Sequence, residues 1–574
     1  MNRISKLLIL ASFLFAATLS AVPLPVYRLP VKVTCATHEA AEGAQLSFLP
    51  FPEGKKVAFS CRWDDSNARH LAMRNLLKKH GYRATFYLTE SGRKEFWSDV
   101  FSSLCSDGFT VGNHTRGHLE LALLTPNAVH NEILGWSILL ETRANQPINA
   151  FVLPYGKYNS PLFSGVPELI GSCLRRGGLL GGPDATPAML KHLKLSEIEY
   201  FGTRLVRPGD RNTSAQKFDE DVRRHLASKE SPLHLTLGIH TLHSDKDLQV
   251  LETSLKRYAG NPDWWYCNEN EYLAYRYLVL HARVLEKKVT GSTAEFLLEL
   301  PCPELLGSDI PLWAECDGQR FPIPHTRKSP TSIGIAAPNG KCARFPGLTA
   351  RLLKTDENHL RLELENSGPE LENLLVTLRL PPDCKEEVIY RQIPKLTGKL
   401  SLDWEVTRLP AADSMRRLTA CQLDFARQGT QGRVWTMLME QIPTSLKSDI
   451  QLHYTSTPLS EEEQLQLSKA ETPLPEKTFV PAFTTPNYRE GVYLVKLPTK
   501  LTPKDTLVAA LDFQGGKPFT LRGELPARIL FNGEPVTPKG NRLLLEATPA
   551  GACRLILVYP PAKRPPRHLI LLHP

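Results

Sequence analysis

Hydrophobic and polar positions follow two different patterns along the chain, and the change falls near residue 291. Before it, short apolar runs typical of buried strands occur at residues 57–61, 84–88, 109–111, 150–153, 198–205 and 233–239. Between these runs, apolar residues recur at helical spacing, and helices are expected at 66–80, 125–142 and 268–280. Strands that alternate with helices predict a parallel sheet or a barrel of βα units.

After residue 291, apolar and polar residues alternate over short segments separated by proline and glycine turns, a pattern typical of β-sandwich modules. We place module boundaries near residues 350 and 470. The polar run at 460–463, followed by Pro473 and Pro475, is the best candidate for a linker. The predicted units are therefore an N-terminal arm at 22–50, an α/β domain at 51–290, and β modules at 291–350, 351–470 and 471–574.

Composition sharpens this division. The chain has 574 residues, of which 42% are hydrophobic and 22% charged, as in an ordinary globular protein rather than a disordered or fibrous one. Residues 1–290 hold 12 of the 17 histidines but only 15 of the 46 prolines. Histidine can bind metals or move protons, so chemistry is expected in the first half. The proline-rich second half disfavours long helices.

The N-terminus has the three parts of a signal peptide. Arg3 and Lys6 precede an apolar run at 7–19, and the small residues Ser20 and Ala21 follow it. We therefore expect residues 1–21 to be removed and the protein to be secreted, or to reside in the periplasm or cell envelope. No later run approaches the roughly 20 apolar residues of a membrane-spanning helix, so no integral membrane segment is expected in the mature chain.

Charge and cysteine usage exclude other classes. The formal net charge of +9 is spread along the chain in pairs such as Lys78-Lys79, without a basic run, so no nucleic-acid partner is expected. Eleven cysteines cannot all pair within one chain, and no C-x-x-C occurs, which removes support for a thiolate zinc site or a thioredoxin-like motif. The oligomeric state stays open.

Four predicted strands are followed within a few residues by polar, titratable or turn residues. The residues that follow them are Asp64-Asp65, His114, Tyr155 and His240. In parallel α/β folds the loops after the carboxyl ends of the strands carry the chemistry. The four positions therefore predict one site at that edge of the sheet.

The residue types at this edge suit a metal. His114 and His118 are four residues apart, so on a helical turn both imidazoles would face one side. Two adjacent carboxylates, Asp64 and Asp65, repel each other unless a cation or proton intervenes. A metal could take one aspartate as a ligand and leave the other as a base. The alternative is that one aspartate caps the next helix and its neighbour is solvated.

The ordered set of motifs resembles the polysaccharide deacetylase family, also known as NodB homology domains or carbohydrate esterase family 4. The resemblance covers residues 51–280 and rests on Trp63-Asp64-Asp65, His114-Thr115-x-x-His118, Pro154-Tyr155-Gly156 and His240. It implies a distorted (β/α) barrel, so the predicted fold class is a multidomain chain with an N-terminal α/β barrel followed by all-β sandwich modules. It also implies a divalent metal, usually zinc, with cobalt or manganese as alternatives, held by Asp65, His114 and His118.

The same resemblance implies roles in removing acetyl groups from an N-acetylated or O-acetylated polysaccharide. Asp64 would be the general base on the attacking water. The backbone N–H of Tyr155 would share the oxyanion of the intermediate with the metal. His240 would be the general acid on the leaving atom, with His243 as a nearby competitor. The expected partner is thus an acetylated glycan.

Three features of the sequence depart from the family pattern. Ser66 replaces a glycine after the paired aspartates, Val152 replaces the arginine that orients the base, and Asp263-Trp264 is not a clean match to the family's aspartate–tryptophan motif. The missing cation could come from one of four arginines, Arg62, Arg116, Arg175 or Arg207. The loss of the usual arginine also supports an alternative, a non-catalytic glycan-binding surface protein that keeps a degenerate barrel. Metal analysis would separate the two, because a binding scaffold needs no ion.

One aromatic cluster follows the predicted acid histidine. Trp264, Trp265 and Tyr266 could stack on sugar rings at the predicted rim of the site, or they could belong to the hydrophobic core.

Overall fold

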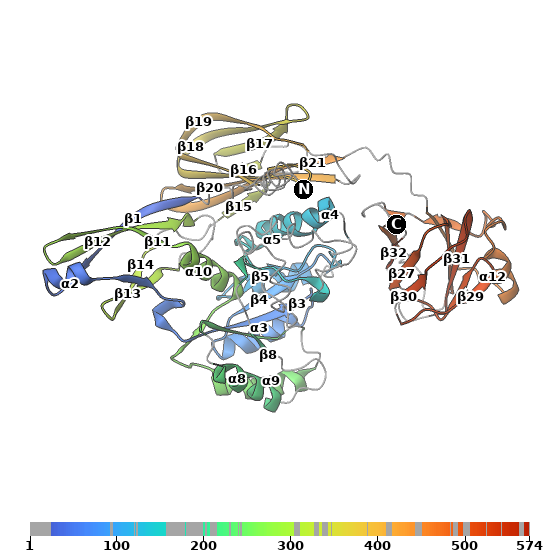
Figure 1. Cartoon of the computed structure of the whole chain (residues 1–574), viewed down its shortest axis with the longest axis horizontal. Coiled ribbons are helices and arrows are strands. Elements are labelled where there is room, and N and C mark those ends of the chain that lie inside the picture. The colour runs from blue at the N-terminus through green and yellow to red at the C-terminus, as the bar shows by residue number, and fades with distance from the viewer. Residues whose placement is uncertain are drawn as a thin grey trace, which may run out of the picture.

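The computed structural model describes residues 25–91, 96–119, 121, 124, 126–156, 178–179, 199–200, 204–206, 215–228, 231–238, 240, 244–303, 310–325, 332–335, 343–345, 347–386, 388–408, 416–441, 450–482, 484–485, 492–496, 506–523, 525–540, 542–561 and 568–572 (Figure 1). The predicted signal peptide, residues 1–21, lies outside the described residues. Among the helices described, none has the length and apolar character needed to cross a bilayer.

A parallel sheet of six strands forms the centre of the N-terminal half. Its order is β5-β4-β3-β9-β8, with β10 also paired to β3. The strands are β3 (Val57–Asp64), β4 (Ala84–Leu88), β5 (Thr110–Asn113), β8 (Arg204–Val206), β9 (Leu233–Leu237) and β10 (Trp264–Tyr266). β3, β4 and β9 are buried at every position, as expected for strands covered on both faces. The predicted closure of this sheet into a barrel lies outside the described residues.

Helices pack around the parallel sheet. They are α3 (His70–Lys79), α4 (Pro126–His130), α5 (Trp136–Ala144), α8 (Ala215–Ala227), α9 (Asp245–Tyr258) and α10 (Glu269–His281), with short helical turns η1 (Pro52–Gly54), η2 (Phe96–Val100), η3 (Phe101–Cys105), η5 (Asn131–Gly135) and η6 (Pro154–Gly156). Capping boxes at Ser244 and Asn268 start α9 and α10. The helix predicted from residue 66 begins at His70, because the Ser66 hydroxyl donates to the Thr89 carbonyl instead of capping it. Residues 150–153 form only a bridge between Phe151 and Asn113 rather than the predicted strand.

The N-terminal arm pairs with the segment that follows α10. β1 (Val26–Thr34), β12 (Thr293–Pro301) and β11 (Arg283–Thr290) make one antiparallel sheet, and β2 (Leu46–Phe48), β13 (Leu312–Cys316) and β14 (Gln319–Ile323) make another. α2 (His38–Gly43) lies between β1 and β2 in the chain, and the short parallel pair β6 (Gly178–Leu179) and β7 (Glu199–Tyr200) stands apart. Strand pairing therefore joins parts of three predicted units, namely the N-terminal arm, the α/β domain and the module at 291–350. The change in composition near residue 291 does not mark a structural boundary, because it falls between the paired strands β11 and β12.

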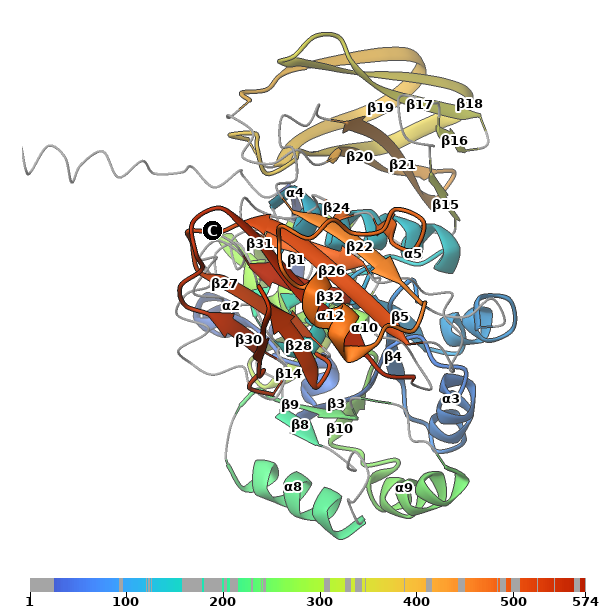
Figure 2. The same cartoon turned by 90° about the vertical axis from the view of Figure 1, so that its right-hand side faces the viewer.

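A seven-stranded sheet follows, and we call it the middle module. It contains β15 (Ser332–Ile335), β16 (Ala343–Phe345), β17 (Leu348–Lys354), β18 (His359–Arg379), β19 (Val388–Glu405), β20 (Arg416–Arg427) and β21 (Thr430–Gln441). The predicted boundary near residue 350 is wrong, because it falls inside β17. In Figures 1 and 2 the middle module lies over α4 and α5.

Two further antiparallel sheets share one apolar core at residues 450–572. One contains β22 (Gln451–Thr455), β23 (Val480–Ala482), β26 (Leu507–Gln514), β28 (Arg528–Phe531), β29 (Glu534–Val536) and β31 (Ala552–Tyr559); the other contains β24 (Thr484–Thr485), β25 (Val492–Lys496), β27 (Phe519–Gly523), β30 (Arg542–Leu545) and β32 (His568–Leu572). The predicted boundary near 470 is wrong, since β22 pairs with β26 across it. The predicted linker at 460–463 is also wrong, because Ser460 caps helix α12 (Glu461–Leu467) through a capping box with Glu463.

The buried side chain of His234 on β9 is expected to make the fold sensitive to acid. Burial, assisted by the charge of Arg276, lowers the pKa of His234 to about 3. The folded state keeps this ring neutral while the unfolded chain protonates it below about pH 6.5, so its contribution to stability is present above that pH and lost as the pH falls towards 3. One such group gives a slope of at most about 1.4 kcal/mol per pH unit.

Urea unfolding of the wild type and His234→Asn at pH 7, 6 and 5 measures this slope. The wild type should lose more stability per pH unit than the variant, whose amide carries no titrating group. His38→Asn, at an exposed position, is the matched control and should follow the wild type. Parallel curves for the wild type and His234→Asn would contradict the assignment of a neutral His234.

Candidate active site

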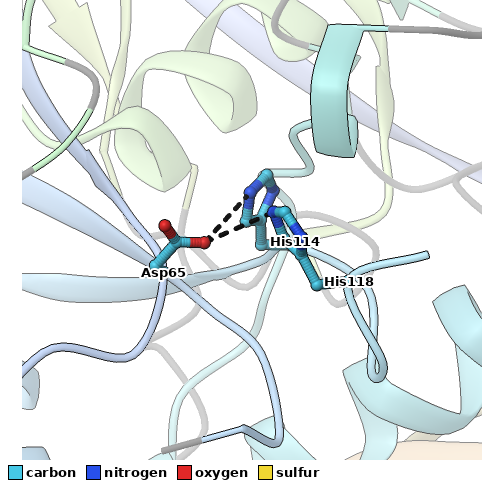
Figure 3. A group of neighbouring side chains, drawn as sticks. All are labelled: Asp65, His114 and His118. Carbon is cyan, nitrogen blue, oxygen red and sulfur yellow. Dashed lines mark ion pairs between the residues drawn. The ribbon is translucent and has the colours of Figure 1, made fainter. Parts of the chain in front are cut away.

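The carboxyl ends of β3 and β5 bring the predicted metal ligands together. Asp64 ends β3 and Asp65 follows it, while His114 follows β5. Of the residues that the structure describes, Asp65, His114 and His118 form a group whose ligand atoms all lie within 4.8 Å of one another. His114 Nε2 lies 3.8 Å and His118 Nε2 3.4 Å from Asp65 Oδ1, and both rings face that carboxylate (Figure 3).

The donor set fits a tetrahedral divalent ion. Ligand atoms about 2.0–2.2 Å from zinc in a tetrahedron lie about 3.3–3.6 Å apart, close to the two distances from Asp65 Oδ1 to the histidine nitrogens. His114 Nδ1 lies 2.8 Å from the Val152 carbonyl, which holds the proton on Nδ1 and leaves Nε2 for a metal. His118 Nδ1 lies 3.2 Å from the Tyr155 hydroxyl. Burial and the charge of His114 lower the pKa of His118, which favours the neutral ring that binds a metal.

The loop that carries both histidines is not the predicted helical turn. Thr115 and His118 have φ values of 61° and 53°, in the left-handed region that helices exclude. The loop is held by its backbone: Asn113 Oδ1 accepts from the Thr115 amide at 2.8 Å, and Glu132 accepts from the amides of Arg116 at 3.1 Å and Gly117 at 2.7 Å. Asp65, with φ 70°, is also left-handed, so backbone strain on both strand ends brings the ligands together.

Asp64 is paired with Arg62, two residues earlier on the same strand. Arg62 Nε donates to Asp64 Oδ1 at 3.0 Å and an Arg62 terminal nitrogen donates to Oδ2 at 2.6 Å, with both side chains 4% exposed. Burial would raise the pKa of Asp64, but the charge of Arg62, then His114 and the Arg62 hydrogen bonds, outweigh it and hold the pKa below its usual value. Asp64 is therefore an ionised carboxylate beside the three candidate ligands.

The structure separates the four arginines that could replace the missing cation. Arg62 contacts Asp64, whereas Arg116 forms a bidentate pair with Glu90. Arg175 and Arg207 lie outside the described residues. The alternative that an aspartate caps the next helix is wrong, because Arg69 is at the N-cap of α3 and makes no side-chain capping bond.

A buried polar column that sequence reasoning missed lies below Asp64. Glu269, from the first turn of α10, accepts hydrogen bonds from Ser60 at 3.2 Å, Thr236 at 3.1 Å and the Tyr87 hydroxyl. Burial raises the pKa of Glu269 to about 7, against the opposing effect of Arg62. Ser60, Arg62 and Asp64 alternate along β3, so the period of two in a strand was the signal that could have placed them on one face.

The two other predicted catalytic residues lie at the edges of this group. Tyr155 is 62% exposed, has φ 59°, and its ring centroid lies 4.8 Å from that of His118. His240 forms a backbone bridge with Asp64 and its side chain is exposed. Its charge acts on both Asp64 and His118. The competitor His243 lies outside the described residues.

Residues 53–168 match the family model described as Polysaccharide deacetylase. The chain carries a polysaccharide deacetylase domain. A peptidoglycan-N-acetylglucosamine deacetylase from Bacillus cereus is 28% identical over 81 residues, which are 14% of this chain and 29% of that protein. The chain thus matches less than a third of that relative's length. Asp64, Asp65 and both histidines of the loop lie inside the family match, and His240 lies beyond it.

Solved structures similar to this chain include two carbohydrate esterases. One is the Xyl-CE4 domain of a multidomain xylanase from the hindgut metagenome of Trinervitermes trinervoides, with 14% identity and a TM-score of 0.28 over 38% of this chain and 89% of that one. Another is a family 4 acetyl xylan esterase from Clostridium thermocellum in complex with a cobalt ion, with 14% identity and a TM-score of 0.26 over 38% and 89%.

The aromatic cluster of the deacetylase domain is not at the rim of this site. β10 pairs with Val57, Ala58 and Phe59 at the start of β3, whereas Asp64 is at its end. Trp264 is buried, and its ring stacks on Phe59 at 5.2 Å and on Tyr258 at 5.5 Å. The prediction of a sugar-stacking rim is wrong for Trp264, and its core alternative is confirmed.

Proposed function

We propose that this protein is a metal-dependent hydrolase that removes acetyl groups from an N-acetylated or O-acetylated polysaccharide. The observation that carries the proposal is the ionised, arginine-paired Asp64 directly beside Asp65, His114 and His118, within a polysaccharide deacetylase domain. We also propose that the parallel sheet closes into a distorted barrel and that β-sandwich modules follow it. Residues 1–21 would direct export, as their pattern of charged and apolar residues indicates.

Asp65, His114 and His118 would hold the divalent ion, with zinc favoured over cobalt or manganese. Such an ion, when bound, supplies the positive charge that polarises the acetyl carbonyl. Asp64 accepts the proton of the attacking water, since each carboxylate oxygen keeps a lone pair beyond its bond to Arg62. His240 donates a proton to the leaving nitrogen or oxygen. The Tyr155 N–H stabilises the oxyanion of the intermediate.

The chemistry of the substrate follows from these roles. The attacked group is an acetyl carbonyl, and the leaving atom is an amine nitrogen or a hydroxyl oxygen that His240 protonates. The relative from Bacillus cereus carries the name of a deacetylase of N-acetylglucosamine in peptidoglycan. We therefore propose an N-acetylated glycan as the first substrate class to examine and an O-acetylated glycan such as acetylated xylan as the second.

Acetate release by the full-length mature chain tests this function. The protein is stripped with a chelator, then assayed with zinc, cobalt or manganese on N-acetylglucosamine oligomers and on acetylated xylan. We expect no release from the stripped protein and restored release with at least one metal. Bound metal without acetate release from any member of the panel would overturn the proposal.

The non-catalytic alternative loses its main support in this structure. That alternative rested on Val152 in place of an arginine. Arg62, two residues before Asp64 on the same strand, places a buried guanidinium against the Asp64 carboxylate. A glycan-binding scaffold would not require the charge of Asp64 to be held in this way. Metal analysis of the purified chain remains the discriminating measurement, because only the enzyme requires the ion.

A further inference from the structure

We propose that the middle module is a structural part of the metal site rather than an appended domain. It would act through residues 131–141, which we call the clamp segment, and which comprise η5 and the first part of α5. The inference rests on the proposed function only in that the loop carrying His114 and His118 binds the metal. Its structural basis is that opposite sides of the clamp segment contact the histidine loop and the middle module.

The first side of the clamp segment fixes the histidine loop. Asn113, the residue before His114, donates from Nδ2 to the Ile133 carbonyl at 2.8 Å and to Ser137 Oγ at 2.7 Å. Glu132 accepts hydrogen bonds from two amides of the loop. Its backbone carbonyl accepts from the Arg116 N–H, and its side-chain carboxylate accepts from the Gly117 N–H. Because the loop contains left-handed residues at Thr115 and His118, it depends on these bonds to keep its shape.

The other side of the clamp segment packs on the middle module. Leu134 and Ile138 form one buried cluster with residues of β20 and β21, namely Leu418, Ala420, Trp435 and Met437. A methyl group built on Gly135 would lie 3.5 Å from Leu418 Cδ2, so this turn already approaches β20 closely. In both Figures 1 and 2 the middle module covers α4 and α5 on the side away from the parallel sheet.

A buried ion pair between Glu141 and Arg433 stabilises the contact between α5 and the middle module. The Glu141 carboxylate accepts from Trp435 Nε1 at 2.7 Å, from an Arg433 guanidinium nitrogen at 3.1 Å and from the Ile148 amide at 3.0 Å. Arg433 Nε donates in turn to Asp424 at 2.6 Å, and the side chains of Glu141 and Arg433 are 0% exposed. A buried charge pair with this many directed bonds permits few alternative arrangements, so it fixes the position of α5 against the sheet.

Two tryptophan variants of the full chain test the proposal. Trp435→Phe removes one N–H donor to Glu141 and leaves the Arg433 pair, so the fold should survive. Trp404→Phe is the matched control: it is a buried tryptophan of the same module in a different cluster, and within the described residues its Nε1 has no hydrogen-bond partner. The readouts are amide hydrogen exchange at Thr115, Arg116 and Gly117 in metal-free protein, and cobalt affinity by competition with a chelator.

We expect faster exchange at the three loop amides in Trp435→Phe and roughly 10-fold weaker cobalt binding, the lower end of the range for groups that orient ligands. Trp404→Phe should leave both readouts at the wild-type values. Equal exchange and equal cobalt affinity in the two variants would overturn the proposal. If the wild type binds none of zinc, cobalt or manganese, the proposed function fails, yet the exchange measurement on metal-free protein still decides the role of the middle module.

Discussion

Asp64→Asn is expected to lower the rate of acetate release by about 10²- to 10⁴-fold, the usual contribution of a general base. Asparagine keeps the shape of the side chain but cannot accept the proton of the attacking water. Because Asp65, His114 and His118 are unchanged, the variant should still bind one metal ion per chain. The measurements are kcat on the glycan that the wild type deacetylates and metal content by elemental analysis.

His114→Ala is the matched variant in which binding and chemistry fail together. Removing one of three protein ligands should abolish stoichiometric metal binding, and activity should fall to background. The two variants thus separate the base at the end of β3 from a metal ligand that follows β5. An Asp64→Asn protein that keeps more than about a tenth of the wild-type kcat would exclude Asp64 as the general base.

Local patterns predicted the strands better than the ends of the helices or the limits of the modules. The run predicted at 84–88 has the same first and last residues as β4, because a strand covered on both faces is a nearly continuous hydrophobic run. The first helix begins four residues later than expected, since Ser66 bonds across to Thr89 instead of capping it. The boundaries near 350 and 470 failed because turn signals mark hairpins within a sheet as readily as linkers between modules.

The candidate site was predictable as far as strand ends allow. Asp65 and His114 meet because parallel strands end at one edge, and that rule needs no knowledge of packing. The positive φ values of Thr115 and His118 were not predictable, because a β-branched threonine rarely adopts one and a histidine does so in only a small fraction of cases. Nor was the ion pair between Glu141 and Arg433, whose partners are 292 residues apart in the chain.

Arg62→Met is expected to move the acid limb of the pH–rate profile to higher pH. The guanidinium is the largest influence that lowers the pKa of Asp64 against burial, so its loss should raise that pKa. The stability that the pair contributes is present above the ordinary pKa of an aspartate and is lost as the pH falls through its lowered value. A buried carboxylate left without its cation should cost about 3–5 kcal/mol of unfolding free energy at pH 7.

The rate at pH 7 should also fall, by roughly 10²-fold, because Asp64 loses the two bonds that orient it. The double variant Arg62→Met/Val152→Arg is the sharper experiment, since it returns an arginine to the position that the deacetylase family uses. Val152 is buried beside the site, since its carbonyl oxygen lies 2.8 Å from Nδ1 of the candidate ligand His114. Partial recovery of kcat and a return of the acid limb towards lower pH would show that the two positions supply the same cation. An Arg62→Met profile that overlies the wild type would show instead that Arg62 only fills the space beside Asp64.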